Sequence, residues 1–532
     1  MTPFTPEDLS DDQRLIARTA AAFLEKEVEP AMDRLEQQDW AIARSLLARC
    51  GELGLIGTDV PEAFGGSGLD TTTSVVVAET LSPEASFSAA FGAQTNLAIV
   101  PILWFGSDEQ QQRYLPGLVS GALVGAYALS ESGSGSDALG ARARATRQAD
   151  GSWHLTGEKM WITNGGFADV FIVFAKVDGT QFSAFIVERG FPGVTTGREE
   201  HKMGLHGSST TPLILQDAKV PAANLLGDVG KGHTVAFTVL NYGRLKLAAV
   251  CTGCAKRAIG EAARYASTRR QFGQPIATFG AIRHKLAEMT IQAYVVESML
   301  YRTAGLLDRQ LASGTATAAR TLETLAIEAS LLKVAGSEML DFVLDENVQI
   351  HGGNGFVRDY PAERRYRDAR VNRIFEGTNE INRLLVPALL AKRAAGGRLP
   401  PADANAHPLK RVATMVLQRA MHTYGEALHQ EQEVLMLASD IIRDAFAAES
   451  ALLRAQRHGG LHVDAAKTFA HDAALRVDAH ACTAIAAMTS GDALNTALAE
   501  LRGLLPIVPV NTVAARRRIA DTVVERKGYV FG

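Results

Sequence analysis

The stretch WHLTGEKMWITN (residues 153–164) sets this chain apart from an all-helical protein, because its side chains alternate with a period of two. Three further stretches alternate in the same way or are rich in β-branched and aromatic residues: DVFIVFAKV (169–177), QFSAFIVE (181–188) and TPLILQDAKV (211–220). Gly, Asn and Asp turns separate them. The pattern predicts a small antiparallel β-domain over about residues 123–232.

On both sides of this domain the apolar residues recur at helical spacing. Residues 1–122 are expected to form an N-terminal helical domain, and residues 233–395 a helical bundle. The segment AAGGRLPPADANAHP (394–408) is rich in Ala, Gly and Pro, which is typical of a domain boundary. Residues 408–532 are helical again and predict a further C-terminal helical domain. The predicted fold is therefore multidomain, mainly α, with a central β-domain.

Composition narrows the class of protein. A chain of 532 residues with 47% hydrophobic and 21% charged residues is expected to form several globular domains. A net charge of -4 argues against a protein that mainly neutralises nucleic-acid phosphates, so no nucleic-acid partner is expected. The acidic start MTPFTPEDLSDDQ resembles neither a signal nor a transit peptide. No apolar run is judged to approach the roughly 20 residues of a membrane span. A cytoplasmic location is expected, with peripheral membrane contact left open.

The cysteines are few: Cys50, Cys251, Cys254 and Cys482. Sparse cysteines favour a reducing compartment over a disulfide framework. Cys251 and Cys254 form a C-x-x-C, but they lie in a helical pattern without a second Cys/His pair to complete a zinc site. We expect them to be buried apolar side chains and predict no metal site.

Five motifs carry the candidate chemistry: YALSESGSGSD (127–137), MWITNGG (160–166), STRRQFGQPI (267–276), VQIHGGNGF (348–356) and RDARVNRIFEGTNEINR (367–383). The first offers hydroxyls and approachable backbone N–H groups to a polar ligand, the second an aromatic plane beside a ring, and the third paired arginines for a pyrophosphate. Each of these three motifs also has a plain structural alternative: a turn for the first, a core tryptophan for the second and a solvated basic helix end for the third. The first motif is not a G-x-G-x-x-G between a strand and a helix, so a Rossmann nucleotide site is not supported.

Glu376 is the candidate base. It stands between the apolar Ile374 and Phe375 and the flexible Gly377. Apolar surroundings raise the pKa of a carboxyl toward neutrality, which a general base requires. By itself this glutamate could equally face solvent at the start of a helix.

The co-occurrence of these motifs, in one order over about 250 residues, decides between the readings. Together with NYGR (241–244) the chain resembles the acyl-CoA dehydrogenase family over about residues 10–395. The resemblance implies a helical domain, a β-barrel domain and a four-helix bundle, with FAD as cofactor and acyl-CoA as substrate. It places Glu376 on the catalytic glutamate.

The same resemblance assigns the remaining site residues. Cofactor contacts fall on Tyr127, Leu129, Ser130, Ser136, Trp161, Ile162, Thr163, Gln349, Gly352, Gly353, Thr378 and Glu380. The FAD of a neighbouring subunit is contacted by Arg269, Gln271 and Phe272, while Ser136, Asn241, Arg244 and Gly377 line the acyl-CoA site.

The appended residues 408–532 resemble the very-long-chain branch of that family, whose members are dimers associated peripherally with a membrane. The helix expected to floor the acyl pocket, QTNLAIVPILWFG (94–106), carries Ala98 and Pro101 where that branch has glycines. Their bulk is expected either to shorten the tunnel or to leave it unchanged.

The implied reaction removes the α-proton by Glu376 and passes the β-hydride to the flavin, giving a trans-2-enoyl-CoA, with an electron-transfer flavoprotein as acceptor. Two alternatives stay open. One is an oxidase of the same fold that passes electrons to oxygen. The other is an assembly or nucleic-acid-binding relative, against which the intact Glu376 segment and the acidic neighbours of Arg516–Arg518 both count.

Overall fold

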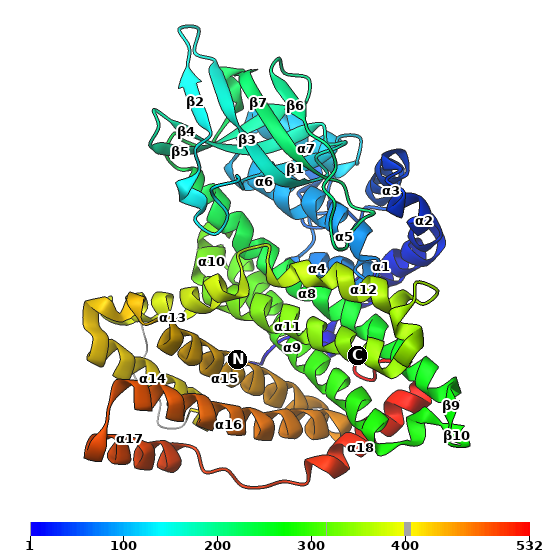
Figure 1. The fold of residues 1–532 in the computed structure, drawn as a ribbon. Coiled ribbons are helices and arrows are strands. Elements are labelled where there is room, and N and C mark those ends of the chain that lie inside the picture. The colour runs from blue at the N-terminus through cyan, green and yellow to red at the C-terminus, as the bar shows by residue number, and fades with distance from the viewer. Residues whose placement is uncertain (1, 315–316, 398–405) are drawn as a thin grey trace.

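The computed structural model describes residues 2–314, 317–397 and 406–532. The large β-sheet lies at one end of the molecule, long helices cross its middle, and the C-terminal helices pack on the side far from that sheet (Figure 1). Most of the predicted boundary 394–408 lies outside the described residues. The order of helices, strands, bundle and extra helices confirms the predicted fold class.

The N-terminal part is helical as expected, and Ser10 and Ser107 begin two of its helices with a capping box. Its helices are α1 (Asp11–Phe23), α2 (Met32–Glu36), α3 (Trp40–Glu52), α4 (Thr71–Leu81), α5 (Ala85–Gly92), α6 (Val100–Phe105) and α7 (Asp108–Val119). A wider helical segment, η5 (Ala93–Ile99), joins α5 to α6 without a break.

One stretch in this part corrects the sequence analysis. Ala85–Phe105 is long and apolar enough, by length and composition, to cross a membrane. However, 72% of its most apolar window is buried inside the protein, which is how the core helix of a globular fold behaves.

The β-domain is one eight-stranded sheet in the order β6-β7-β3-β2-β4-β5-β8, with β1 beside β4. The strands are β1 (Gly125–Ala128), β2 (Arg144–Arg147), β3 (Trp153–Thr163), β4 (Val170–Val177), β5 (Gln181–Glu188), β6 (Val194–Thr196), β7 (Thr210–Val220) and β8 (Leu225–Leu226). The prediction of a purely antiparallel domain is wrong, because β4 pairs in parallel with β1 and with β2. Since β3 runs antiparallel to β2 and β4 turns back from β3, β4 must run in the direction of β2.

The bundle is built on long helices, and α8 packs against both α9 and α11. Its elements are α8 (Gly232–Thr268), a hairpin of β9 (Arg270–Gln271) and β10 (Gln274–Pro275), α9 (Gly280–Ala312), α10 (Ala318–Thr324), α11 (Ala326–His351), α12 (Pro361–Ala369) and α13 (Asn379–Ala395). The hairpin lies at the end of α8 remote from the sheet (Figure 1).

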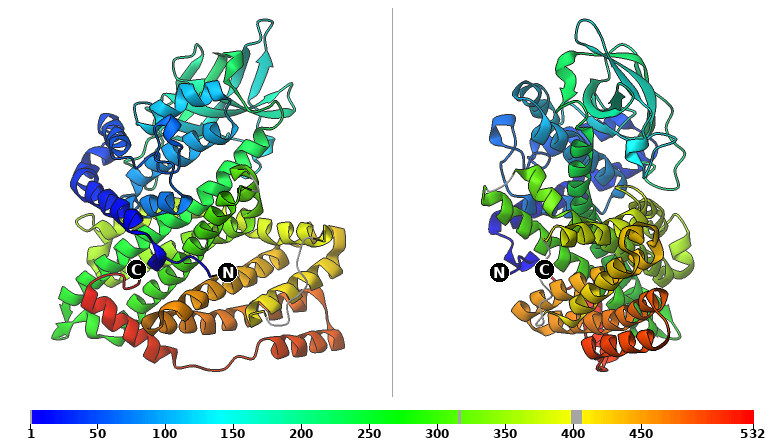
Figure 2. Two further views of the ribbon diagram at one scale, coloured as in Figure 1. Left: turned by 180° about the vertical axis from the view of Figure 1, so that it is seen from behind. Right: turned by 90° about the vertical axis from the view of Figure 1, so that its left-hand side faces the viewer.

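The C-terminal helices form a layer against the bundle. They are α14 (Pro408–Tyr424), α15 (Gln432–His458), α16 (Gly460–Met488), α17 (Gly491–Leu504) and α18 (Thr512–Arg526). Helix α15 packs on α9 and α13, and α18 packs on α9. Both views of Figure 2 keep this layer on the side of the bundle away from the strands.

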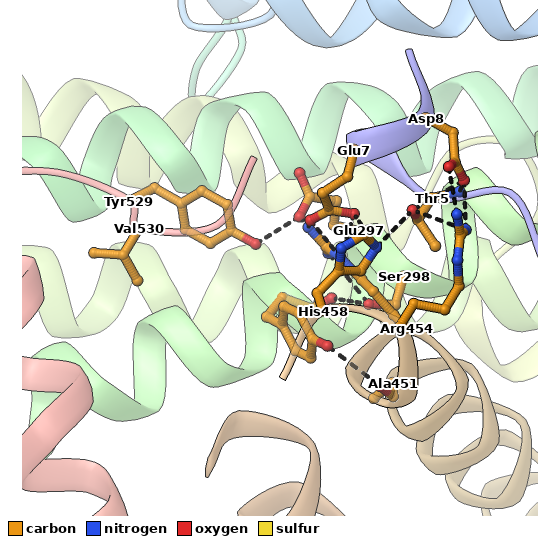
Figure 3. A network of polar contacts seen from close by, with 12 residues as sticks. Thr5, Glu7, Asp8, Glu297, Ser298, Ala451, Arg454, His458, Tyr529 and Val530 are labelled. Atoms are coloured by element: carbon orange, nitrogen blue, oxygen red, sulfur yellow. Dashed lines mark hydrogen bonds and ion pairs between the residues drawn. The ribbon is translucent and has the colours of Figure 1, made fainter. Parts of the chain in front are cut away.

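A buried cluster of charges ties the two ends of the chain to the bundle (Figure 3). Arg454 of α15 is fully buried and lies 2.6 Å from Glu297 of α9 and 2.5 Å from Glu7. The Tyr529 hydroxyl donates to Glu297 at 2.7 Å, and Lys256 of α8 contacts the same carboxylate. Charges this deeply buried persist only when they are paired, so the cluster fixes how α15 and the C-terminal tail dock.

Candidate active site

Glu376 lies in a turn that leads into α13, and the turn is held from three sides. Its φ of 60° is in the left-handed region, where a non-glycine residue is strained. The Arg244 guanidinium of α8 donates to the Glu376 carbonyl at 3.0 Å, and the Asn382 amide donates to the carbonyls of Gly377 at 2.8 Å and Thr378 at 3.0 Å. The Thr378 hydroxyl caps α13 by accepting from Ile381 N–H. The strained backbone is therefore stabilised by side chains from two helices.

Burial raises the pKa of the Glu376 carboxyl to about 7, although the charges of Arg244 and Lys333 work against the rise. The cost of burial also lowers the pKa of Arg244 to about 10 and that of Lys333 to about 8. The Glu376 Oε2 atom is buried and has no hydrogen-bond partner. A carboxyl that titrates near neutrality and keeps one oxygen uncommitted can accept a proton from a ligand.

Gly243 of α8 makes room for this carboxyl. A Cβ atom placed on Gly243 would lie 2.9 Å from Glu376 Oε2 and 3.0 Å from Oε1. The glycine thus marks the place where helix α8 and the candidate base approach most closely.

We expect Gly243→Ala to slow catalysis about 10- to 100-fold, because displacing a reacting group by about 1 Å has costs of this order. Folding should not suffer, since alanine is favoured over glycine inside a helix and only the end of a flexible side chain must move. The matched control is Gly260→Ala on the same helix, whose Cβ meets the flexible Arg264 guanidinium. Steady-state rates and melting temperatures of the two variants check this prediction, and equal rates would contradict it.

A cavity opens beside Glu376 and runs between α5 and α8. From α8 it is lined by Gly243, Lys246, Leu247, Val250 and Cys254, and from α5 and η5 by Ala85, Ser88, Ala89, Gly92, Ala93, Asn96 and Leu97. The small residues at 85, 88, 89, 92 and 93 leave an elongated space. At one end of this wall Cys254 donates to the Ser82 carbonyl, just before α5.

The expectation that Ala98 and Pro101 floor this cavity is wrong. Both side chains are buried elsewhere, and neither lines the cavity. Ala98 faces the sheet, where a Cβ on Gly125 would lie 2.2 Å from it. The far end of the cavity is instead polar, with Arg364 of α12 paired to Glu84 at 2.8 Å and Arg365 paired to Glu84 and Glu261.

The residues expected to contact the flavin lie between the sheet and the cavity. Thr163 lines the cavity, and Ile162 beside it is buried. Trp161 is 56% exposed with a φ of 60°, next to a break in the β3–β7 register. Of the remaining predicted contacts, Leu129 and Ser130 are half-buried, while Ser136 and Glu380 are exposed.

Two observations test whether these residues fit a flavin. The Tyr127 hydroxyl is buried without a hydrogen-bond partner, and its pKa is raised by burial and by the charge of Glu376. The indole of Trp161 is a large aromatic surface left uncovered at a strained position. A buried hydroxyl without a partner and an uncovered aromatic plane are each features that a planar, polar ring system would engage.

A second group of predicted contacts lies far from Glu376 in the same chain. Arg269 and Gln271 are exposed, and Phe272 is 93% exposed at the β9–β10 hairpin. Arg244 and Arg269 are 25 residues apart on or beside α8, which is roughly 37 Å at 1.5 Å per residue. Gln349, Gly352 and Gly353 are also exposed, and the adjoining His351 stacks on Tyr265 near this end of α8, with ring centroids 4.2 Å apart. The chain therefore does not bring this group to its own Glu376.

The sequence analysis missed the support of the Glu376 turn. Lys333 of α11 is fully buried and donates to the Asn379 side chain at 2.6 Å. The Asn382 side chain donates to the Gly377 carbonyl within the turn. Lys333 is the one charged residue in the apolar run SLLKVAG (330–336), and this pattern could have indicated a buried, functional lysine. Asn241 and Arg244, which the resemblance assigns to the acyl-CoA site, contact each other: the guanidinium donates to the Asn241 Oδ1 at 3.0 Å. Neither is among the residues that line the cavity.

The C-x-x-C has the structural role expected. Cys251 and Cys254 are free thiols inside α8, both buried. Burial raises the pKa of Cys254 to about 12, so it stays a neutral thiol.

Comparison with known proteins adds the family context. Residues 10–122, 126–218 and 230–391 match the N-terminal, middle and C-terminal domains of acyl-CoA dehydrogenases, and residues 408–503 match a further acyl-CoA dehydrogenase C-terminal domain.

Among relatives, a probable acyl-CoA dehydrogenase of Bacillus subtilis is 44% identical over 99% of this chain and 96% of its own length. The very long-chain specific acyl-CoA dehydrogenase of Rattus norvegicus is 40% identical over 69% of this chain and 55% of its own length. The crystal structure of an acyl-CoA dehydrogenase complexed with FAD from Bacillus anthracis matches with a TM-score of 0.97 at 45% identity, covering 100% of this chain and 98% of that one.

Proposed function

The chain belongs to the acyl-CoA dehydrogenase family and is an FAD-dependent oxidoreductase, and from this premise we propose that it converts long-chain acyl-CoA to trans-2-enoyl-CoA in fatty acid β-oxidation. The observation that carries the proposal is Glu376, a carboxyl with a pKa of about 7 and one uncommitted oxygen at the head of an elongated cavity.

In the proposed mechanism the chain positions the thioester and removes one proton. Trp161 and Thr163 would hold the flavin ring of FAD, which would supply the acceptor for the β-hydride. Glu376 takes the α-proton on its free Oε2 atom. Within the described residues the Glu376 backbone N–H has no acceptor, and we assign it to the thioester oxygen, where it stabilises developing negative charge. Arg244 and Asn382 keep the turn in the strained form that presents both groups.

The cavity walls set the proposed chain length. Gly243 to Cys254 on α8 and Ala85 to Asn96 on α5 and η5 each span 11 residues, or about 16 Å at 1.5 Å per residue. An extended alkyl chain advances about 1.25 Å per carbon, given C–C bonds of about 1.5 Å, so the walls hold about 13 carbons beyond the reacting pair. Acyl chains of about 14 to 16 carbons should therefore fit best, and longer ones would meet the Arg364–Glu84 ion pair.

Anaerobic flavin bleaching by a series of saturated acyl-CoAs from 4 to 24 carbons tests the proposal. We expect the fastest bleaching at about 14 to 16 carbons, because these chains bury the most methylene groups without breaking the ion pair, at about 0.8 kcal/mol each. Bleaching by no chain length would refute dehydrogenation, and peroxide formation in air would favour the oxidase alternative.

Gly92→Leu is the companion variant. The new side chain fills the cavity midway along the wall formed by α5 and η5, at the last residue of α5, where a Cβ meets only the Asn96 side chain at 3.8 Å. The preferred length should fall to short chains while the rate with 4 carbons is kept. An unchanged profile would show that the acyl chain does not follow this cavity.

The proposed partners follow from the exposed surfaces. A homodimer would bring Phe272 and Gly352 of one subunit to the FAD of the other, which explains why these residues are exposed and remote from Glu376. An electron-transfer flavoprotein is the proposed acceptor. For a peripheral membrane contact through residues 408–532, the candidate segment is the linker between α17 and α18 together with the first turn of α18, where Val508, Val510 and Val513 are exposed.

A further inference from the structure

The C-terminal helices contact the helix that follows the catalytic turn. Arg383 of α13 pairs with Asp440 of α15 at 2.9 Å and with Glu338 of α11 at 2.7 Å. Arg443 of α15 pairs with the same Glu338 at 3.0 Å. Glu338 thus lies at a junction of the bundle and the C-terminal domain.

From Glu338 the contacts continue inward to Lys333. The Asn379 amide donates to Glu338 at 3.2 Å and to the Ser337 hydroxyl at 3.0 Å. The Asn379 Oδ1 accepts from Lys333 at 2.6 Å. Asn379 and Lys333 are buried, and the hydrogen bonds of Asn379 satisfy both ends of its side chain. A buried amide with three partners has one orientation, so it transmits the position of Glu338 to Lys333.

Asn379 is three residues after Glu376 and begins α13. The groups that face the Glu376 carboxyl are Arg244 from α8, Lys333 from α11 and the Tyr127 hydroxyl from β1. Lys333 and Asn379 therefore act on both the charge around the base and the backbone that carries it.

We propose that the C-terminal domain positions the catalytic base through a polar relay, Arg443–Glu338–Asn379–Lys333, which ends at the Glu376 turn. Glu338 and Arg443 are positioning residues in this scheme, since neither touches the reacting atoms. The proposal rests on the proposed function, and it gives residues 408–532 a role in catalysis beyond support of the fold.

The charges of the relay suit this task. Burial works to raise the pKa of Glu338, but hydrogen bonds and charge from Arg383 and Arg443 hold it below its ordinary value, so Glu338 stays ionised. Asp440 and Asp444 keep other arginines, Arg383 and Arg476, when Arg443 is replaced. Removal of Arg443 should therefore disturb Glu338 without detaching α15.

The test compares Arg443→Met and Glu338→Gln with the unaltered enzyme in anaerobic flavin reduction at saturating acyl-CoA from pH 5.5 to 9. We expect the rate to fall at least about tenfold, the size of a small misplacement of a base. The half-maximal pH should move upward, because a looser turn lets the Glu376 carboxyl leave the two cations that lower its pKa. Affinity for acyl-CoA should stay within about twofold, and Arg443→Lys should restore part of the rate.

Arg516→Met is the matched control. Arg516 of α18 joins Glu288 of α9 to Asp472 of α16, so it is an ion pair of the same interface that lies off the relay. It should lower the melting temperature about as much as Arg443→Met but leave the rate and the pH profile unchanged.

The outcomes separate the two proposals. If the unaltered enzyme bleaches and Arg443→Met behaves like Arg516→Met, the relay is refuted and the proposed function stands. If Arg443→Met does not fold, an unchanged pH profile in Glu338→Gln refutes the relay equally. Failure of the unaltered enzyme to bleach with any acyl-CoA would refute the proposed function itself.

Discussion

Glu376→Gln should slow flavin reduction by acyl-CoA about 10²- to 10⁴-fold, the usual contribution of a positioned general base. The amide has nearly the shape of the carboxyl but cannot take the α-proton. The backbone contacts from Arg244 and Asn382 go to main-chain carbonyls, so the turn should persist. Stopped-flow measurement of flavin absorbance checks the rate, and titration with acyl-CoA checks that binding is kept.

The rate of flavin reduction should also depend on pH in a definite direction. The base works when ionised, so in the unaltered enzyme the rate should rise with pH through about 7, the pKa to which burial raises Glu376. This rise of the rate with pH should be absent in Glu376→Gln. A retained rise, or retained turnover, would show that another group is the base.

Stability provides the control for the same variant. A carboxyl with a folded pKa above its ordinary 4.5 favours the folded state below pH 4.5, and this contribution is lost as the pH rises through about 7. Glutamine avoids the cost of burying an ionised group, so the melting temperature at pH 8 should not fall. A large fall would mean that slow turnover reflects damage to the fold.

The second large effect concerns the fold. Arg454→Met should destabilise the protein by about 3–5 kcal/mol, the usual cost of removing one partner from a buried ion pair. It leaves Glu297 fully buried, and it removes the partner of Glu7 and the cation that lies 4.6 Å from the centre of the Tyr294 ring. The retained contacts from Lys256 and Tyr529 favour the lower end of this range. Urea and thermal unfolding measure the change.

Arg457→Met is the matched control, one turn further along α15. Its ion pair with Asp8 at 2.6 Å is partly exposed on both sides, and pairs of this kind contribute about 1 kcal/mol or less. Equal destabilisation by the two variants would contradict the assigned importance of burial.

The acid dependence follows from the direction of the Glu297 pKa. Burial works to raise it, but Lys256 and Arg454 hold it below the ordinary 4.5. The cluster therefore stabilises the fold above pH 4.5, and this contribution is lost as the pH falls through the folded pKa. The gap between Arg454→Met and the unaltered protein should narrow in acid.

Local patterns in the sequence were sufficient to predict the order and type of the domains. The change from period two at residues 153–164 to helical spacing on both sides predicted the order of the domains, because backbone geometry imposes those periods on any half-buried element. The order of the motifs around IFEGTNEI likewise identified Glu376 and the family. Strand direction was not predictable, because the parallel pairing of β4 with β1 and β2 depends on which strands become neighbours.

The tertiary structure alone decided the surroundings of the base and the shape of the cavity. One face of α5 and η5 lines the cavity, through residues 85, 88, 89, 92, 93, 96 and 97, while Ala98 lies against Gly125 of the sheet. Lys333, Glu338, Asn379 and Arg443 meet only because α11, α13 and α15 pack together, over separations of up to 105 residues. The sequence alone determined that Glu376 is the candidate base. Its pKa depends on burial and on charges brought by distant helices, and no local pattern encodes that packing.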